Sequence, residues 1–526
     1  GASRLDKTLC AAPTTAVALG MYGKMPGVAF EDYVDARCIV LWGGNPRVSH
    51  VHLVPFIKEA RQRGAFVAVV DPVRTFPASE ADLHLPVLPG ADLPLALALI
   101  RYWAKWDALD LPFLARHATG VEPLLEQAEM WTLEVAGAAT GVAPADIERL
   151  AREYAERSPA VIRCGWGPEP AILAMPALLG KFGVRGGGYT MSNSGAVRFD
   201  RDAVLGPIEW STERLNQTQL ARQLLSERSP RLRALFVYNC NPVATVPEQT
   251  LVLAGLRRDD LFTVVFDQVM TDTAMYADIV LPATTFLEHW DVRVGYGRYA
   301  VGLCRPVIEP RGEARSNIEV FGQLGRAMGF SDEAFGWTQE EAARRVLDAV
   351  QTPDGIALEP VDDGITWKPA FPDGSPIQFG TVFPLTPDRK VNLTPPVLGQ
   401  APYRWDPVPT GRYPLSLISP ATAKTVNSTM GQYALDELYV EIHPDDALPR
   451  AITDGDRVRV FNDLGEVACS ARVSDRIRSG VVLIPKGAWR ASSGNGATAT
   501  ALCPADVNPV AGGACYNDAR VEVQLM

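Results

Sequence analysis

The chain has 526 residues, a net charge of −11 and a sequence pI near 5.2, and 47% of its residues are hydrophobic. An acidic field of this size repels nucleic acids and anionic membrane surfaces, so we expect neither as a partner. The length predicts several domains, and the apolar runs fall far below the roughly 20 residues that a helix needs to insert in a membrane.

Cysteine and histidine spacing excludes several kinds of site. No two of the eight cysteines form a C-x-x-C pair, which argues against a disulfide scaffold, a zinc ribbon or an iron–sulfur cluster built from this chain alone. His50 and His52 lack a third ligand, and we interpret them as structural. Sparse cysteine is typical of a reducing compartment, so a cytoplasmic location is predicted, with a periplasmic one left open.

The first segment of interest is the opening stretch, GASRLDKTLCAAPTTAVALG. It has no initiator Met and no apolar export segment, and Cys10 lies among small residues just before a predicted helix. A free cysteine at such a junction is usually a small buried residue, so the spacing alone assigns Cys10 no chemistry.

A βαβ unit is predicted over residues 38–86. The apolar run CIVLW leads into Gly43, Gly44 and Asn45, an amphipathic stretch follows, and AFVAVVD is a second strand with Asp71 at its carboxyl end. Ligands of parallel sheets bind outside the carboxyl ends of the strands. Asp71 can accept there from a ribose hydroxyl or a purine amino group, and Asn45 offers an amide.

The same pattern returns 196 positions later, in ALFVYNCNP, LFTVVFD and ADIVLP. The matching pairs are Asn45 and Asn241, Asp71 and Asp267, Thr75 and Thr271, Asp82 and Asp278, and Asp92 and Glu288. Asn-Pro and Asp-Pro also mark ordinary turns, but agreement in register favours an internal duplication with two similar nucleotide sites. Neither copy has G-x-G-x-x-G, which disfavours an ordinary NAD or FAD fold.

The last part of the chain changes character. From Tyr413 onward, short strands such as RVRVF and GVVLIP alternate with turns, as in a β-barrel. The predicted fold class is α/β, with two related dinucleotide-binding α/β domains built on parallel sheets and a C-terminal β-barrel domain. We expect the first α/β domain at 1–185, the second at 186–345, a linker at 346–412 and the barrel at 413–526.

The motifs, in this order, resemble the molybdopterin oxidoreductases of the dimethyl sulfoxide reductase and formate dehydrogenase superfamily. The resemblance covers nearly the whole chain and is carried by IVLWGGNP, VVDPVRT, ADLHLPVLPGADLPLALA, GKFGVRGGG, FVYNCNP and FDQVMTDTAMYADIVLPATTFLE. It implies a molybdenum or tungsten ion held between two pterin guanine dinucleotides, one for each α/β domain. It also implies two-electron oxygen-atom or hydride transfer on a small-molecule substrate.

The resemblance gives Cys10 a role. In this family a Cys, selenocysteine, Ser or Asp that ligates the metal lies just upstream of the first Asn-Pro strand, and RLDKTLCAAPTTA occupies that place. Cys10 would be the catalytic residue and the metal ligand, since a thiolate suits a soft metal centre. Formate dehydrogenase-like activity is one alternative, although Ala11 and Ala12 stand where such relatives have His. A non-catalytic scaffold subunit that has lost the metal is another.

Further cofactor contacts are expected at strand ends and loops. In the first copy they are Gly43, Gly44, Asn45, Asp71, Arg74, Thr75, Gly90 and Asp92. In the second copy they are Asn239, Asn241, Asp267, Gln268, Thr271, Thr273, Asp278 and Glu288. In the barrel they are Ser419, Thr425, Asn427, Ser428, Asn508, Tyr516 and Asn517. The threonines serve equally well as helix caps, and the barrel residues could instead satisfy turn backbone.

The sequence departs from the family in two places. Relatives usually carry an N-terminal [4Fe–4S] domain, so we expect that cluster in a missing N-terminal region or a partner, with an iron–sulfur domain or subunit as the electron partner. The second α/β domain is expected to be incomplete for the same reason. After the strand AVIRCGWG, the chain enters a helix almost directly, and the shortened loop after Gly167 puts full cofactor binding in question.

Overall fold

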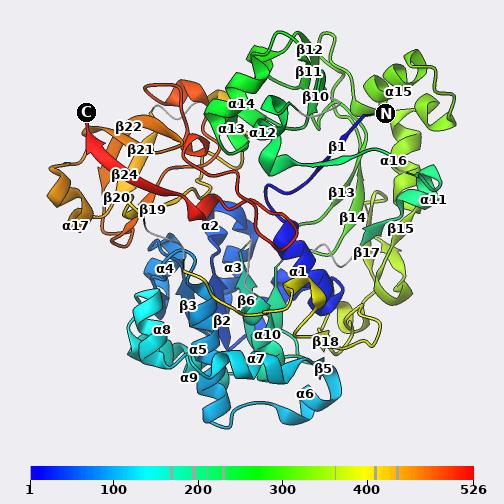
Figure 1. The fold of residues 1–526 in the computed structure, drawn as a ribbon. Helices are drawn as coiled ribbons and strands as arrows, with labels where there is room; N and C mark the ends of the chain where they lie inside the picture. The colour runs from blue at the N-terminus through cyan, green and yellow to red at the C-terminus, as the bar shows by residue number, and fades with distance from the viewer. Residues whose placement is uncertain are drawn as a thin grey trace.

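A computed structural model describes residues 2–165, 170–191, 197–209, 211–227, 231–361, 363–407, 411–433 and 437–526. The molecule consists of two α/β units and a barrel, with the first unit at the bottom of Figure 1, the second at the top and the barrel at the upper left. This arrangement confirms the predicted fold class. The shortened loop after Gly167 lies outside the described residues.

The first α/β unit is built on a five-stranded parallel sheet in the order β4-β3-β2-β6-β7. Its strands are β2 (Cys38–Trp42), β3 (Phe66–Val70), β4 (Leu83–Leu85), β6 (Ala160–Cys164) and β7 (Gly188–Thr190). Every residue of β2, β3 and β6 is buried, as expected for a parallel sheet covered on both faces. One face packs on α1 (Ala12–Tyr22), α5 (Asp92–Lys105), α9 (Pro144–Glu156) and α10 (Pro170–Leu178), and the other on α3 (Val54–Gln62).

The second α/β unit repeats the first in reduced form. Its parallel strands β10 (Ala234–Tyr238), β11 (Phe262–Asp267) and β12 (Ile279–Pro282) correspond to β2, β3 and β4. Its helices are α12 (Leu220–Leu225), α13 (Pro242–Thr245) and α14 (Gln249–Leu256), of which α13 matches α2 (Pro46–Ser49). Strand β10 is an edge of its sheet, whereas β2 is central and pairs with β6 on its other side. Phe236 and Tyr238 of β10 are therefore partly exposed.

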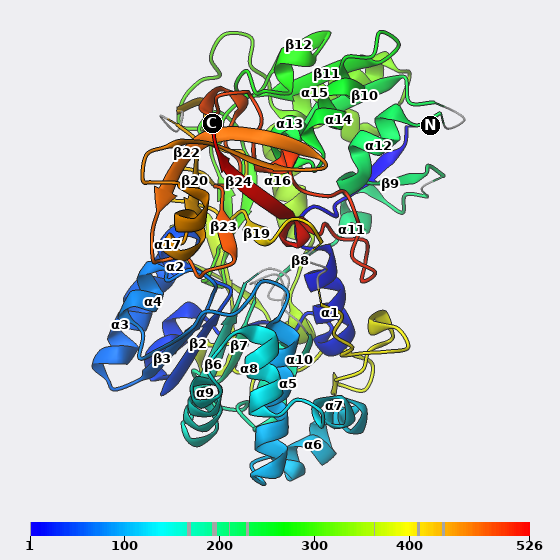
Figure 2. The same cartoon turned by 60° about the vertical axis from the view of Figure 1, so that its left-hand side comes forward.

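The barrel closes in the order β19-β23-β20-β22-β21-β24. Its strands are β19 (Leu415–Ile418), β20 (Tyr439–Ile442), β21 (Arg457–Asn462), β22 (Gly465–Val473), β23 (Val481–Leu483) and β24 (Arg520–Leu525). The alternating apolar residues of these strands form a separate core. Figures 1 and 2 both show the barrel beside α2 of the first unit and near α13 of the second.

Strand pairing crosses the predicted domain limits. Near the N-terminus, β1 (Arg4–Asp6) pairs in parallel with β9 (Arg214–Asn216), and β7 belongs to the first sheet although it follows residue 185. The segment predicted as a linker supplies β16 (Leu358–Pro360) and β17 (Thr366–Pro369) to an antiparallel sheet with β13 (Asp291–Val294) and β14 (Val301–Cys304). It is thus folded against its neighbours, while the division into four parts stays a prediction.

Over the described ranges, the structure contains no helix with the length and apolar character required to cross a membrane.

Candidate functional site

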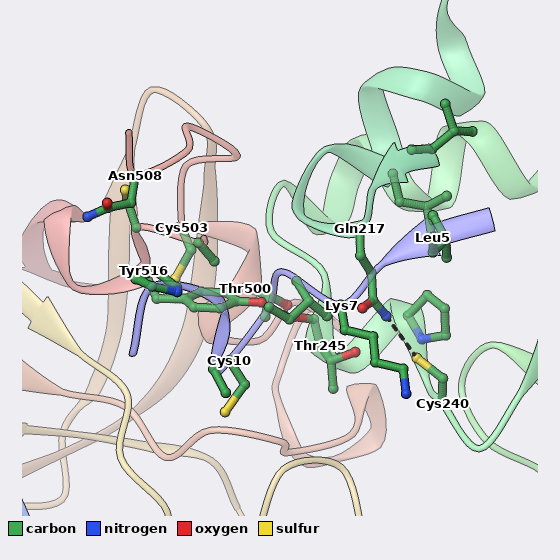
Figure 3. A pocket seen from close by; sticks show the side chains of 18 of the residues that line it. Leu5, Lys7, Cys10, Gln217, Cys240, Thr245, Thr500, Cys503, Asn508 and Tyr516 are labelled. Carbon is green, nitrogen blue, oxygen red and sulfur yellow. Dashed lines mark hydrogen bonds between the residues drawn. The ribbon is translucent and has the colours of Figure 1, made fainter. Parts of the chain in front are cut away.

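A cavity of about 2080 Å³ lies where the N-terminal loop, both α/β units and the barrel meet. Figure 3 shows it from close by, with side chains from the N-terminal loop, the second unit and the barrel. The predicted site residues that line it are Cys10, Gly90, Asp92, Asn239, Asn241, Ser419, Asn427, Ser428, Asn508, Tyr516 and Asn517. Segments hundreds of positions apart in the chain therefore line the same cavity.

Cys10 projects from the loop between β1 and α1 and is exposed, whereas Cys38, Cys164, Cys469 and Cys503 are buried. In Figure 3 it lies near Tyr516, whose hydroxyl donates to the carbonyl of Thr245 in the second unit. The alternative of a small buried cysteine is therefore wrong for this position. Among the described residues, no group of three or more His, Cys, Asp or Glu is arranged to hold a metal ion.

The two Asn-Pro strand ends have the same local conformation. Gly43 and Asn239, which are equivalent by the duplication, are both left-handed, with φ of +61° and +52°. Asn45 and Asn241 each precede a short helix that begins with Pro, yet neither side chain caps that helix. Neither amide is therefore used to cap the helix that follows it.

Asn241 is held by a neighbouring threonine. Its Oδ1 accepts from the backbone N–H (3.2 Å) and the Oγ1 hydroxyl (2.7 Å) of Thr273. Its Nδ2 is buried and has no hydrogen-bond partner in the described part of the chain. The amide is thus fixed with its donor group unused, beside the cavity. Thr273, itself a predicted contact, holds the Asn241 side chain in place.

Asp71 and Asp267 stand at the carboxyl ends of their strands, as predicted, and Asp92 is the first residue of α5. Burial raises the pKa of Asp71 to about 7, although Oδ1 accepts from the Val73 N–H at 2.9 Å. Burial also raises the pKa of Asp267, which accepts from the Gln268 N–H at 2.7 Å. Asp92 accepts from the Trp42 indole N–H at 2.7 Å, and burial raises its pKa as well. Of the three, only Asp92 lines the cavity.

Some side chains predicted to contact the cofactor instead form hydrogen bonds with the protein backbone. Asp278 accepts from the Thr263 N–H at 2.6 Å, and its equivalent Asp82 accepts from the Val67 N–H at 2.8 Å. Both carboxylates lie at the amino ends of the strands, the edge opposite the ligand edge. The assignment of Asp278 as a cofactor contact is therefore corrected: it ties neighbouring strands together.

Glu288 stays a prediction as a cofactor contact, and its carboxylate is partly used by local backbone. Its carboxylate accepts from the Thr285 N–H at 2.7 Å and from the Arg311 N–H at 2.9 Å, so both oxygens stabilise local backbone. Thr271 accepts from the Ala274 N–H at 3.1 Å, the capping alternative considered for it. Thr425 bonds Thr422 in a turn of the same loop.

The remaining first-copy candidates lie at the carboxyl edge but outside this cavity. They are Gly43, Gly44, Asn45, Arg74 and Thr75. Arg74 donates through its backbone N–H to the Arg476 carbonyl of the barrel, and its side chain is not part of an ion pair among the described residues. In the second copy, Gln268 donates to the Thr284 carbonyl at 3.1 Å.

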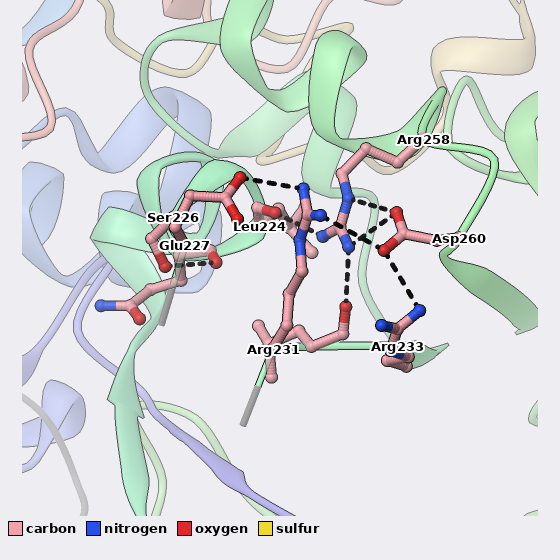
Figure 4. A network of polar contacts seen from close by, with 9 residues as sticks. Leu224, Ser226, Glu227, Arg231, Arg233, Arg258 and Asp260 are labelled. Atoms are coloured by element: carbon pink, nitrogen blue, oxygen red, sulfur yellow. Dashed lines mark hydrogen bonds and ion pairs between the residues drawn. The ribbon is translucent and has the colours of Figure 1, made fainter. Parts of the chain in front are cut away.

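An arginine network shapes one rim of the cavity (Figure 4). Arg258 donates to Asp260 at 2.9 Å, and Arg231 and Arg233 approach the same carboxylate at 3.5 and 3.4 Å. The hydrogen bond from Arg258 lowers the pKa of Asp260, which stays ionised. Arg231 and Arg233 also line the cavity, and their ion pairs with Asp260, which does not line it, set their positions.

Sequence reasoning missed several lining residues. Lys7 and Lys486 line the cavity, and neither belongs to an ion pair within the described ranges. Thr498 and Thr500 of the barrel line it too. Lys7 precedes Cys10 by three positions, and this proximity could have identified it as a candidate site residue. The barrel threonines lie in a loop with no pattern of its own.

Comparison with known proteins agrees with this geometry. The sequence profile of the family Molybdopterin oxidoreductase matches residues 6–105 and 170–327, and that of the Molydopterin dinucleotide binding domain matches residues 415–520. "Probable oxidoreductase YoaE" of Bacillus subtilis is 32% identical over 100% of this chain and 80% of that protein. Dimethyl sulfoxide reductase DmsA of Escherichia coli is 28% identical over 89% of this chain and 68% of that protein.

A methanogen protein and a solved structure extend the comparison. The F420-dependent formate dehydrogenase subunit alpha of Methanocaldococcus jannaschii is 27% identical over 87% of this chain and 72% of that protein. Acetylene hydratase from Pelobacter acetylenicus superposes with a TM-score of 0.79 at 22% identity, over 98% of this chain and 81% of that one, which shows a common fold.

The duplicated α/β units thus match a family of oxidoreductases, and the barrel matches a domain that binds molybdopterin dinucleotides. The chain belongs to the molybdopterin oxidoreductase superfamily, which confirms the resemblance predicted from its motifs.

Proposed function

We propose that this chain is the catalytic unit of a molybdenum- or tungsten-dependent oxidoreductase that performs two-electron oxygen-atom or hydride transfer, with Cys10 as the metal ligand. The observation that carries the proposal is the exposed thiol of Cys10 inside the cavity where both α/β units and the barrel converge. A scaffold subunit without metal would have no need of an exposed thiol at this point.

The residues around the cavity fit a polar cofactor. Buried polar atoms without a hydrogen-bond partner in the described part of the chain include Asn241 Nδ2 and Ser419 Oγ, from residues that line the cavity. Asn45 Oδ1 and Thr75 Oγ1 are also unpaired, at the carboxyl edge of the first sheet outside the cavity. Leaving such a group unsatisfied costs roughly 1–3 kcal/mol, so several together favour a ligand that pairs with them. The cavity also exceeds the roughly 300–1,000 Å³ typical of sites for small ligands, as two pterin guanine dinucleotides would require.

Charge in the cavity suits a ligand that carries phosphates. Lys7 and Lys486 offer ammonium groups without a carboxylate partner in the described ranges, in a chain whose net charge is −11. Asn239, Asn241 and Ser419 would hold one dinucleotide from the second unit and the barrel. When bound, the metal and its pterins supply the electron-transfer chemistry. The protein contributes the Cys10 thiolate, the donors and a site partly closed to water.

The electron partner proposed for this chain is an iron–sulfur domain or subunit. Two-electron chemistry at a buried centre requires a route for the electrons, and the described residues hold no cluster of metal-ligating side chains of their own. Formate as substrate has one observation in its favour, the similarity to a formate dehydrogenase subunit. Ala11 and Ala12 after Cys10 offer no proton acceptor and count against it.

Metal and pterin analysis tests the proposal directly. The protein, purified from a cell that makes the cofactor and together with any partner that copurifies, is analysed by elemental mass spectrometry and by fluorescence of oxidised pterin. We expect close to one molybdenum or tungsten and two pterins per chain. Protein that folds correctly but contains neither metal nor pterin would contradict the proposal and support the scaffold alternative.

A further inference from the structure

We propose that Gln249 is a positioning residue that sets the spacing between two walls of the cavity, the strand-end segment 241–245, which includes α13, and the barrel loop 498–503. The inference rests on the proposed function and deepens it, since those walls would hold the second of the two dinucleotides. Gln249 itself does not line the cavity.

The side-chain amide of Gln249 forms hydrogen bonds with both of these segments. Gln249 is the first residue of α14 and only 1% exposed. Its Nε2 donates to the Val243 carbonyl at 2.9 Å and to Thr498 Oγ1 at 3.2 Å. Its Oε1 accepts from the Thr498 backbone N–H at 3.0 Å. One buried amide therefore joins the second α/β unit to the barrel through three bonds.

Each segment that Gln249 holds leads directly to the cavity. Val243 follows Asn241, whose buried Nδ2 is unpaired among the described residues. On the barrel side, Thr498 Oγ1 lies 3.2 Å from Thr500 Oγ1, and both threonines line the cavity. A shift of Gln249 would move donors on both walls at once.

The backbone before Gln249 supports the same assignment. Glu248 is left-handed, with φ of +56°, a conformation that costs a residue with a side chain about 1 kcal/mol or more. That turn directs Glu248 toward the barrel, where its N–H donates to the Cys503 carbonyl at 3.2 Å and its carboxylate accepts from the Ala505 N–H at 3.4 Å. Arg222 holds the carboxylate from behind, at 3.0 and 3.1 Å.

The duplication shows that this tie is specific to one half of the molecule. The residue equivalent to Gln249 in the first copy is Leu53, which is fully buried and cannot make these bonds. The barrel contacts the first copy through another loop, with a β-bridge between Val73 and Ile477 and a bond from the Arg478 N–H to the Pro72 carbonyl. Loss of Gln249 should therefore affect the second dinucleotide site alone.

The test compares Gln249→Leu with Gln378→Leu. Gln378 is a matched control because it is fully buried, accepts from the Tyr189 N–H at 2.9 Å and donates to the Pro26 carbonyl at 2.9 Å, away from the cavity. We measure thermal unfolding, the rate at which metal and pterin dissociate from the loaded protein, and hydrogen exchange in peptides that contain Thr498 or Val243.

Both variants are expected to unfold at a lower temperature, because each loses buried hydrogen bonds. Only Gln249→Leu should release cofactor faster, by about ten- to a hundredfold, the usual effect of removing a side chain that orients ligating groups. The same variant should raise hydrogen exchange at Thr498. Equal cofactor release from Gln249→Leu and Gln378→Leu, with equal exchange at Thr498, would overturn the inference.

A second variant covers the case in which Gln249→Leu does not fold. Thr498→Val removes one acceptor of the Gln249 amide but keeps the Thr498 N–H, so it should show a smaller increase in the same two rates; no increase would count against the inference. Wild-type protein without cofactor would contradict the proposed function. The exchange measurement still tests Gln249 in that protein, so the two failures are distinguishable.

Discussion

Cys10 is the residue on which the proposed chemistry depends. We expect Cys10→Ala to fold like wild type, because the side chain is exposed, and to lose activity by roughly 100-fold or more through loss of the proposed metal ligand. Cys10→Ser keeps an oxygen ligand and should retain part of the bound metal with an altered electron paramagnetic resonance signal.

Cys304→Ala is the control for Cys10, since Cys304 lies in β14 outside the cavity. Activity and spectrum should be those of wild type. Full activity in Cys10→Ala would show that the thiol is not a ligand.

Asp71 predicts a pH dependence of stability in the cofactor-free protein. Burial, with a contribution from Asp92, raises its pKa to about 7 from an ordinary value near 3.8. The folded state therefore favours the protonated carboxyl, and stability falls as the pH rises from about 4 to about 7, by at most on the order of 4 kcal/mol.

Asp71→Asn should remove this dependence, because the amide does not ionise and can still accept from the Val73 N–H. Thermal unfolding at pH 5 and pH 8 measures the difference. If wild type and variant lose stability in parallel over this range, Asp71 is not the responsible group.

At the scale of secondary structure, the duplicated strands account for the success of the sequence prediction and for its errors. The apolar runs of β2, β3, β10 and β11 and the polar residues at their carboxyl ends were predictable, because they are local patterns that parallel sheets require. Asp278 was misassigned, because an acidic residue kept in both copies can also reflect a shared structural bond, here those of Asp278 to Thr263 and of Asp82 to Val67.

The corrected role of Asp278 makes a prediction about stability. Asp278→Ala should lower the free energy of unfolding by about 1–3 kcal/mol, because the Thr263 N–H loses its acceptor, with metal and pterin content unchanged. Asp82→Ala should have a similar effect through Val67. Urea unfolding and elemental analysis of the same samples measure both quantities. Loss of cofactor without loss of stability would restore Asp278 as a contact.

For the whole molecule, the decisive feature is how the barrel is held on the first α/β unit. Arg478 reaches from the barrel to the carbonyls of Pro86 and Thr140, the latter at 3.0 Å, and burial lowers its pKa without a carboxylate in contact among the described residues. The guanidinium thus joins two domains through main-chain acceptors that have no side-chain signature.

Arg478→Met keeps the aliphatic stem and removes these bonds, so the barrel should separate from the first unit more often. We expect faster limited proteolysis of the intact chain and an interface weakened by about 1.5–3 kcal/mol, the range for hydrogen bonds to a charged group. Arg472→Met, on the exposed side of β22, should digest like wild type. Equal digestion of both variants would mean that other contacts hold the barrel.

The sequence by itself determined the class of the protein, the duplicated α/β units, the barrel and the place of Cys10. Each of these is encoded in short patterns, such as an apolar strand followed by polar residues or a set of motifs in a fixed order. The interpretation of such patterns does not depend on distant residues. The tertiary structure alone decided which polar side chains face the cavity and which hydrogen-bond to backbone groups instead. Gln249 and Thr498 are 249 positions apart, and such a pairing depends on how separate domains pack, which no local pattern records.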